Sequence, residues 1–245
     1  ILNSCDKLIH TVRTTGRHFM FGETTYYRPQ AQYCRRKAAE GVFGDFVYGE
    51  GEYFHDFDHG RYTLKQVREH RQASRSGQEW VRKLQSYWDR GILNGPMHYP
   101  THSTAGPICV MNAHMTKVFA VGCRDRTGDE FFAHSLANET ALFEMSNGAG
   151  VRICEYRQVA ADSREGFRVY GTNGSFEHGK LQRRQGEGQE PTVDQMRDPL
   201  PEEVAAAWRA ASGEEKDFYG GHGGSHAYLV NEFVDAIAHD RTPAI

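Results

Sequence analysis

The sequence predicts an α+β protein built around a largely antiparallel β-sheet. Two hairpin signals predict this sheet: Asn147-Gly148 separates two strand-like segments, and the glycine-bounded stretch 171–174 separates two more. Asn-Gly pairs favour the tight turns whose twist matches that of antiparallel strands. Helices on either side of the hairpins are predicted by composition or by apolar residues at helical spacing, and the two that precede the hairpins each stop at a glycine.

Composition indicates one large folded domain or slightly more. The chain has 245 residues, of which 38% are hydrophobic and 12% aromatic, enough for a substantial core. A net charge of −3 gives no overall attraction to nucleic acid or to an anionic membrane, and no apolar run approaches the ~20 residues of a membrane span. The five cysteines are scattered and lack a CxxC pair. We therefore expect reduced thiols, a cytoplasmic location and no structural zinc site.

The first forty residues predict a helix, a strand and a second helix. Residues 4–15 have one apolar face and end at Gly16, and residues 29–40 stop at Gly41, so both segments predict helices with a glycine cap. Residues 17–21 between them predict a short strand. A helix that runs into a strand is half of a βαβ unit, so we expect the chain to open within a domain.

The middle of the chain supplies the sheet. The predicted strands are residues 44–54, 117–123, 140–146, 151–158, 167–170 and 175–177. The polar segment 63–88 predicts either exposed helices or a long excursion, and the breaker-rich segment 182–201 predicts a loop. Residues 227–238 have an apolar face and predict the last helix.

The most reactive group of side chains lies in residues 95–107, between two Gly/Pro breaks. Pro100 is favoured at the first position of a helix, and a residue before proline avoids helical geometry. We therefore expect Tyr99 just outside the helix and His102 in its first turn, with Thr101 and Ser103. The helix dipole disfavours imidazolium there, so His102 is expected to stay neutral and able to accept a proton. The alternative is a surface turn in which His102 only caps or packs.

Other motifs are weaker. The loop 55–59 contains two imidazoles and two carboxylates, but their spacing matches no standard zinc signature, so we predict no metal site. The glycines of residues 220–224 precede a helix; they suit close approach to a polar ligand, or simply a loop that needs positive φ. No GxGxxG motif follows a strand and opens a helix, and there is no phosphate loop, GxSxG elbow or HExxH motif.

Four motifs, spread over most of the chain, resemble the Gfo/Idh/MocA oxidoreductase family. They read AAEGVFGDFVYGEGEYFHD, YPTHS, VYGTNGSFE and HGGSHAYLVNEFVDAI followed by DRTP. The YPTH and HGG motifs resemble especially the branch that contains the NAD-dependent glycosidases of glycoside hydrolase family 109. The resemblance implies an N-terminal Rossmann domain and a C-terminal domain with an open, mainly antiparallel sheet flanked by helices. Residues 1–28 would then be the last helix and strand of the Rossmann domain, and residues 29–245 the substrate-binding and oligomerisation domain.

The same resemblance assigns roles to five residues. His102 matches the family's catalytic histidine and is the expected general base, and Tyr99 would relay a proton or hold the sugar. His98 stands where the family often has an aspartate, and we expect it to contact substrate. His222, on the glycine loop, is expected to reach the substrate as well. Glu23 is expected to line the nicotinamide side of the cofactor.

The function implied is that of an NAD(P)-dependent oxidoreductase acting on a sugar or polyol. NAD or NADP would be bound mainly by the Rossmann domain, most of which this sequence lacks, so the chain alone is expected to be inactive. One alternative is a family 109 glycosidase, in which bound NAD transiently oxidises the sugar. Another is a substrate-binding or oligomerisation module without redox activity. We expect a homo-oligomer formed through the open sheet.

Overall fold

The computed structural model describes residues 2–56, 69–70, 72–124, 135–211 and 220–245. The chain divides into two compact units. The larger is Cys34–Pro191, and the smaller combines Ile1–Tyr33 with Thr192–Ile245. Each unit is described on its own. The predicted domain boundary between residues 28 and 29 stays a prediction.

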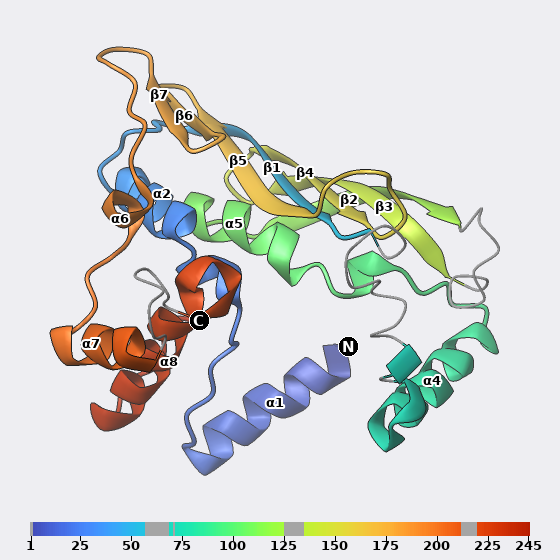
Figure 1. Ribbon diagram of the computed structural model, residues 1–245. Coiled ribbons are helices and arrows are strands. Elements are labelled where there is room, and N and C mark those ends of the chain that lie inside the picture. Colours follow the sequence, from blue (N-terminus) through green and yellow to red (C-terminus); the bar gives the residue numbers. More distant parts are fainter. Residues whose placement is uncertain (1, 57–68, 71, 125–134, 212–219) are drawn as a thin grey trace. The chain divides into compact units, whose positions relative to one another are not determined.

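An open, mixed sheet forms the larger unit (Figure 1). Among the described residues it has seven strands in the order β2-β3-β4-β1-β5-β6-β7. All neighbours are antiparallel except β1 and β4, which are parallel. The predicted α+β class and mainly antiparallel sheet are therefore confirmed. The strands are β1 (Phe46–Phe54), β2 (Met115–Arg124), β3 (Leu136–Met145), β4 (Gly150–Tyr156), β5 (Arg164–Gly171), β6 (Gly174–Glu177) and β7 (Lys180–Arg183).

Both predicted hairpins are present. The turn between β3 and β4 contains Gly148 at a φ of +84°, a backbone conformation that glycine adopts without steric cost. The side chain of Asn147 accepts a hydrogen bond from the Ala149 N–H at 3.1 Å, which closes the turn. In the second hairpin β5 pairs with β6, and Val169 lies opposite Phe176. Both of these side chains are buried in the core.

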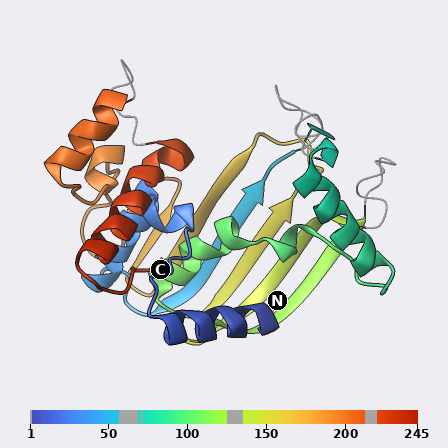
Figure 2. The same cartoon turned by 90° about the horizontal axis from the view of Figure 1, so that it is seen from below.

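Helix α5 (Thr101–Met111) lies across one face of the sheet, over β4, β1 and β5 (Figure 2). This close packing depends on glycines in the contact. A Cβ atom at Gly51 would clash with the carbonyl oxygen of Ser103, and one at Gly106 would clash with the ring of Phe167. The helix backbone therefore rests almost directly on β1. Two further helical segments of this unit are α4 (Arg75–Trp88) and the 3₁₀ turn η2 (Pro96–His98).

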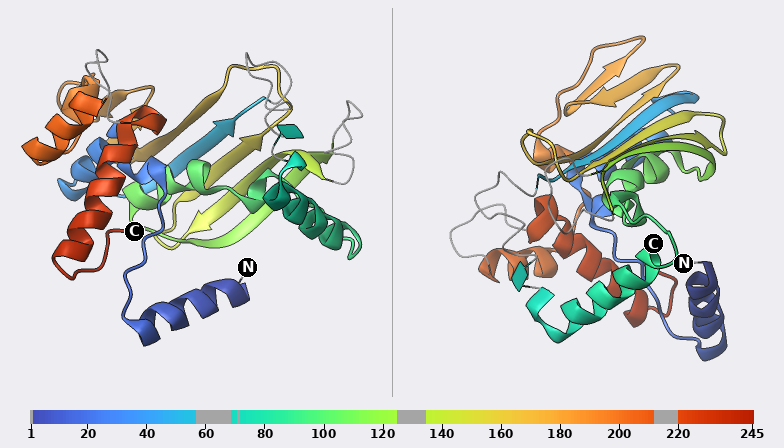
Figure 3. Two further views of the ribbon diagram at one scale, coloured as in Figure 1. Left: turned by 60° about the horizontal axis from the view of Figure 1, so that its bottom comes forward. Right: turned by 90° about the vertical axis from the view of Figure 1, so that its right-hand side faces the viewer.

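No described helix of this unit covers the opposite face of the sheet, as the right-hand view of Figure 3 shows. This face carries charged residues. Across β1 and β5, Arg168 lies 2.6 Å from Glu50 and 2.9 Å from Glu52. Farther toward the β2 edge this face becomes apolar, with Phe119 69% and Leu142 52% exposed on paired positions of β2 and β3. We call this side of the sheet the open face.

The smaller unit is helical. It contains α1 (Leu2–Thr15), η1 (Thr24–Tyr27), the start of α2 (Pro29–Ala39), α6 (Val193–Met196), α7 (Glu202–Ala211) and α8 (Gly221–Ala238). The three predicted helices are confirmed: α1 and α2 are followed by Gly16 and Gly41 at φ of +63° and +73°, and α8 covers residues 227–238. Among the described helices, none is both long and apolar enough to cross a membrane.

Two expectations need correction. Residues 17–21 do not form the predicted strand. A strand needs a neighbour to complete its hydrogen-bond ladder, and here the Phe21 N–H donates to the carbonyl oxygen of Ile245 at 3.2 Å. The predicted loop 182–201 contains the end of β7 and the one-turn helix α6. Thr192 and Gln195 form a capping box for α6: each side chain accepts a hydrogen bond from the other's N–H.

Two further differences concern helices. Helix α7 was not expected; Pro201 precedes it and two glutamates occupy its first turn, both of which favour a helix start. The segment 63–88 forms helix in its described part, in agreement with one of the two alternatives. Residues 57–59 of the acidic and histidine-bearing loop lie outside the described residues.

Candidate active site

The start of α5 has the geometry that the sequence predicts. Tyr99 has a φ of −140° and a ψ of 63°, outside the helix, and Pro100 is the N-cap residue. The helix begins at Thr101, so His102 is in its first turn, and the Thr104 N–H donates to the Pro100 carbonyl oxygen at 2.9 Å. The predicted boundary is correct to one residue, because Pro100 itself stands just before the first helical position.

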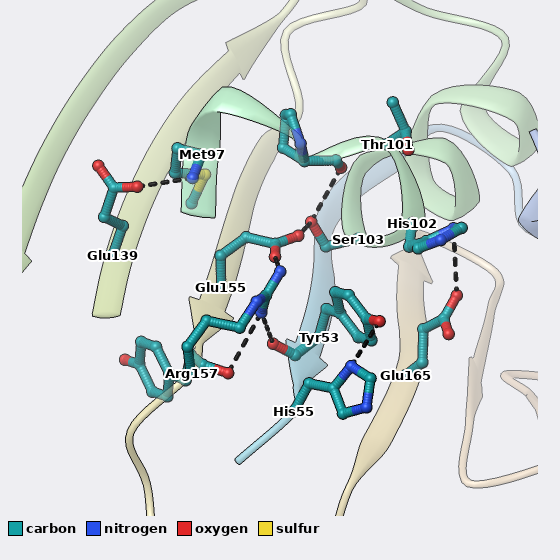
Figure 4. A network of polar contacts seen from close by, with 12 residues as sticks. Tyr53, His55, Met97, Thr101, His102, Ser103, Glu139, Glu155, Arg157 and Glu165 are labelled. Atoms are coloured by element: carbon teal, nitrogen blue, oxygen red, sulfur yellow. Dashed lines mark hydrogen bonds and ion pairs between the residues drawn. The ribbon is translucent and has the colours of Figure 1, made fainter. Parts of the chain in front are cut away.

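Three side chains surround the His102 imidazole: Glu165, Tyr53 and Tyr99, the first two of which are labelled in Figure 4. Its Nδ1 atom lies 3.5 Å from Oε1 of Glu165 on β5, and the two side chains are only 14% and 13% exposed. The ring of Tyr53 on β1 meets the imidazole edge-on at a centroid distance of 5.4 Å, and that of Tyr99 does so at 6.0 Å. These contacts fix the plane of the imidazole and direct Nδ1 toward the carboxylate.

Two electrostatic effects oppose each other at His102. The positive end of the α5 dipole disfavours a protonated imidazole, as expected from the sequence. The Glu165 carboxylate, which the sequence analysis did not foresee, favours one. Because both side chains are largely shielded from water, the attraction between them is screened less than a surface pair would be. The imidazole is thus placed where it can accept a proton and where the resulting positive charge is stabilised.

A buried polar network holds the first turn of α5 against the sheet. Ser103 donates a hydrogen bond from Oγ to Glu155 on β4, and Arg157 donates to the other Glu155 oxygen at 2.6 Å. Arg157 also donates to the Tyr53 carbonyl oxygen at 3.1 Å, and its guanidinium lies 4.4 Å from the centre of the Tyr53 ring. Burial raises the pKa of the Glu155 carboxyl, while Arg157 and the Ser103 hydrogen bond lower it in part. A fully buried carboxyl with both oxygens bonded is a rigid support.

His55 completes the set of ionisable side chains around His102. Its Nδ1 atom lies 2.7 Å from the Tyr53 hydroxyl. Burial lowers the pKa of His55, the positive charge of Arg157 and the proximity of His102 lower it further, and Glu165 opposes the change. The hydrogen bond between Nδ1 of His55 and the Tyr53 hydroxyl orients the ring that contacts His102.

His98 has a local role in the structure. Its Nδ1 atom contacts the Asn94 side chain and lies 3.3 Å from the Gly95 N–H, which caps the short helix η2. Tyr99, by contrast, is 63% exposed and lies beside His102. The structure therefore brings Tyr99 and His102 together, and it directs the Nδ1 side of His98 back toward the segment that precedes it.

Glu23 and His222 both belong to the smaller unit. Glu23 is buried, and its Oε1 accepts the Thr25 N–H at 2.8 Å as the N-cap of η1. His222 is exposed and has a φ of +56°, at the head of a left-handed run that continues through two glycines. Non-glycine residues in that region are strained by about 1–3 kcal/mol, and such strain is concentrated at functional sites. The glycine loop thus has the positive φ values that the second alternative, a loop that needs positive φ, expects.

Hydrogen bonding assigns the tautomers of a histidine pair in this loop. The Gly221 N–H donates to Nδ1 of His226 at 3.1 Å, so a neutral His226 carries its proton on Nε2. That Nε2 lies 3.0 Å from Nδ1 of His222 and donates to it. His222 then carries its own proton on Nε2, which makes this atom a hydrogen-bond donor. His226 was not singled out in the sequence, because the left-handed run of residues 222–224 that brings the two rings together has no helical spacing by which to predict the pair.

The sequence carries no recognisable motif for binding a dinucleotide. A diphosphate needs several converging backbone N–H groups or cations, and the sequence has no glycine fingerprint for one. The expected cofactor ligand Glu23 is an anion, and one of its oxygens caps η1. Among the described residues, no group of three or more His, Cys, Asp or Glu side chains is arranged to hold a metal ion.

The chain was compared with protein families, curated proteins and solved structures. No protein-family model matches the chain. A curated relative is the α-N-acetylgalactosaminidase of Tannerella forsythia, which is 24% identical over 262 residues. The match covers 96% of this chain and 54% of the relative, so the chain spans about half the length of this relative.

Solved structures share the fold. One is the aldose-aldose oxidoreductase of Caulobacter crescentus, with a TM-score of 0.63 and 16% identity over 98% of this chain and 60% of that protein. Another is a levoglucosan dehydrogenase in complex with NADH and L-sorbose, with a TM-score of 0.60 and 16% identity over 93% of this chain and 58% of that protein. At these identities the likeness establishes the fold.

Proposed function

We propose that the full-length protein carrying this chain, which has the motifs and fold of the Gfo/Idh/MocA oxidoreductases, is an NAD(P)-dependent oxidoreductase acting on a sugar or polyol. The predicted resemblance to this family, and to its glycoside hydrolase family 109 branch, is confirmed. The chain supplies the C-terminal part of such a protein. The activity, substrate and partners of the whole protein are our proposal.

The single observation that carries the proposal is the setting of His102. An imidazole at the first turn of α5, fixed by Glu165, Tyr53 and Tyr99 and largely shielded from water, is suited to remove a proton. Oxidation of an alcohol carbon requires loss of its hydroxyl proton together with a hydride. In our proposal His102 takes that proton, and the nicotinamide cofactor supplies the hydride acceptor when it is bound.

Tyr99 lies where it can assist His102. Its ring meets the His102 imidazole edge-on, and it is 63% exposed. In our proposal it orients the substrate hydroxyl or relays its proton. His98 and His222 are kept as candidate substrate contacts, although the Nδ1 side of His98 is engaged within its own turn. Glu23 is kept as a residue on the nicotinamide side of the cofactor.

Three further parts of the proposal concern the whole protein. The cofactor is NAD or NADP, held mainly by a domain outside this chain, in keeping with the NADH in the levoglucosan dehydrogenase complex. The protein forms homo-oligomers through the open face, whose apolar strip includes Phe119 and Leu142. It works in the cytoplasm, the location that scattered cysteines without a pairing pattern favour.

A second candidate function is a glycosidase that uses the same first proton transfer. The observation in its favour is the α-N-acetylgalactosaminidase of Tannerella forsythia, which matches 96% of this chain. A third candidate, a substrate-binding or oligomerisation module without redox activity, predicts neither NAD binding nor turnover in the full-length protein. The architecture alone does not choose among them, because one fold can carry several chemistries.

One experiment on the full-length protein separates the three candidates. The protein is denatured and assayed for released NAD(H). The native protein is then incubated with free sugars, polyols and nitrophenyl glycosides while NADH and nitrophenol are recorded separately. NADH that accumulates with a free sugar establishes the dehydrogenase. Nitrophenol without NADH, from protein that retains its NAD, establishes the glycosidase. Neither product and no bound nucleotide would contradict both and favour the third candidate.

A further inference from the structure

The inference concerns Glu165, a carboxylate on β5 that no sequence motif singled out. Glu165 lies opposite Tyr53 of β1 in the sheet register and points to the face that α5 covers (Figure 4). Its Oε1 atom is 3.5 Å from Nδ1 of His102, and its side chain is 13% exposed. An acidic side chain is seldom this buried unless a partner compensates its charge.

We propose that Glu165 is a positioning residue for His102: it holds the ring proton on Nδ1 and leaves Nε2 to accept the substrate proton. The inference rests on the proposed function and deepens it. An ionised carboxylate has only acceptor atoms, so it attracts an N–H group and repels a nitrogen lone pair. The neutral imidazole therefore carries its proton on Nδ1, facing Glu165, and its lone pair lies on Nε2.

The neighbouring groups support this division of roles. The two oxygens of Glu155, the nearby buried carboxyl, already accept hydrogen bonds from Ser103 and Arg157. The Tyr53 and Tyr99 rings restrict the tilt of the imidazole. His55 and Arg157 disfavour extra positive charge at this cluster. The Glu155 carboxyl also interacts electrostatically with His102 and, like Glu165, favours a positive charge there, but of the two carboxylates Glu165 is the one whose oxygen lies 3.5 Å from Nδ1 of the imidazole.

The proton transfer from the substrate hydroxyl to His102 needs no other proton acceptor. The O–H bond of the substrate hydroxyl breaks as an N–H bond forms at Nε2, and the imidazole becomes a cation with a proton on each nitrogen. Glu165 stabilises this cation from 3.5 Å, while the α5 dipole destabilises it. Because the stabilisation is larger for the cation than for the neutral ring, Glu165 lowers the barrier to proton transfer. Loss of the carboxylate that orients a metal-bound histidine reduces activity by about 10- to 100-fold, and we expect a reduction of similar size here.

The direct test is the tautomer of His102, read by ¹⁵N NMR of the full-length protein with labelled histidine. The His102 signals are assigned by their loss in the His102→Gln variant. In the wild type we expect Nδ1 to have the ¹⁵N chemical shift of a protonated ring nitrogen. In Glu165→Met we expect the shifts to change toward those of the tautomer that is protonated on Nε2. Glu165→Gln keeps the shape and a neutral acceptor, so it is measured in case Glu165→Met does not fold. The control Glu177→Gln alters a carboxylate on β6 that bonds Tyr170 and is expected to change nothing.

Turnover is measured on the same variants. We expect kcat to fall about 10- to 100-fold in Glu165→Met and Glu165→Gln with little change in KM. An unchanged His102 tautomer in Glu165→Met, or unchanged kcat in both variants while His102→Ala is inactive, would overturn the inference. If His102→Ala itself keeps full turnover, the proposed base is wrong; the tautomer measurement still decides whether Glu165 sets the ring proton.

Discussion

At the scale of single residues, the proposed proton transfer depends on one side chain, the imidazole of His102. His102 was selected from its position after Pro100, and the structure places it in the first turn of α5 with Glu165 and Tyr53 against the ring. The residues that hold it were not selected. Glu155, Arg157 and Glu165 are isolated charged positions on strands, and locally they resemble any polar residue on a solvated face. They come to surround the first turn of α5 only because this helix packs on β1, β4 and β5.

Removal of the His102 imidazole should affect turnover and leave cofactor affinity unchanged. In the full-length protein, His102→Ala is expected to lower kcat by roughly 10²–10⁴, the usual contribution of a general base. The measurement is steady-state kinetics together with NAD(P) titration. Tyr99→Phe, which keeps the ring and removes the hydroxyl, separates proton relay from packing. Full activity of His102→Ala would exclude His102 as the base.

The lowered pKa of His55 makes stability depend on pH. Burial, Arg157 and His102 hold this pKa below its ordinary value of 6.5. As the pH falls, His55 therefore becomes protonated at a higher pH in the unfolded chain than in the folded protein. The His55 contribution to the free energy of unfolding is therefore complete above about pH 6.5 and declines as the pH falls toward the folded pKa. Urea unfolding between pH 8 and pH 5 should show a smaller acid-side loss in His55→Gln than in the wild type. Equal losses in the two proteins would show that His55 does not contribute.

At the scale of elements, local signals predicted which segments form helices and strands, but not all of their partners. The hairpins β3–β4 and β5–β6 follow from turn residues, because each strand pairs with the next one along the chain. Strand β1 instead lies between β4 and β5, far from it in sequence. No local signal encodes such a long-range pairing, so the order of strands was not predicted. The segment 17–21 has the composition of a strand, but no strand pairs with it among the described residues.

The contact between α5 and β1 should tolerate no side chain at Gly51. A Cβ there would clash with the Ser103 carbonyl oxygen, so Gly51→Ala forces the first turn of α5 outward. We expect Gly51→Ala to lower the free energy of unfolding by about 1–3 kcal/mol, as overpacking of a core does. The check is urea unfolding, with Gly166→Ala on β5 as the control. A Cβ at Gly166 meets nothing within 4 Å, so this variant should unfold at or above the wild-type urea concentration.

At the scale of the whole molecule, the chain offers an extended surface in addition to the active-site cluster. The open face combines ion pairs on β1 and β5 with an apolar strip on β2 and β3. Exposed apolar patches rimmed by polar residues are typical of protein–protein contacts. The fold class and the presence of this sheet were predictable from composition and turns, and the fold of the solved relatives agrees.

The proposed oligomer should depend on the apolar strip. Phe119 is 69% exposed on the open face, and an aspartate in its place would bury a charge in the contact between subunits. Light scattering after gel filtration of the full-length protein should give a smaller mass for Phe119→Asp than for the wild type. Val193→Asp, at an equally apolar but separate exposed position on α6, should leave the mass unchanged. An unchanged mass for Phe119→Asp would contradict assembly through this strip.

The absence of a side chain at Gly51 has a consequence for how variants of this protein could acquire new substrates. Because Gly51 has no Cβ atom, the Thr101–Ser103 turn can lie close to the sheet, and this distance also determines the position of the His102 imidazole. Substitutions at the glycines of this contact, on β1 and in α5, can therefore displace His102 without altering any residue that we propose to touch substrate. A directed-evolution library limited to pocket-lining positions would miss them, and one that varies residues 49, 51 and 106 would sample the reach of His102 directly.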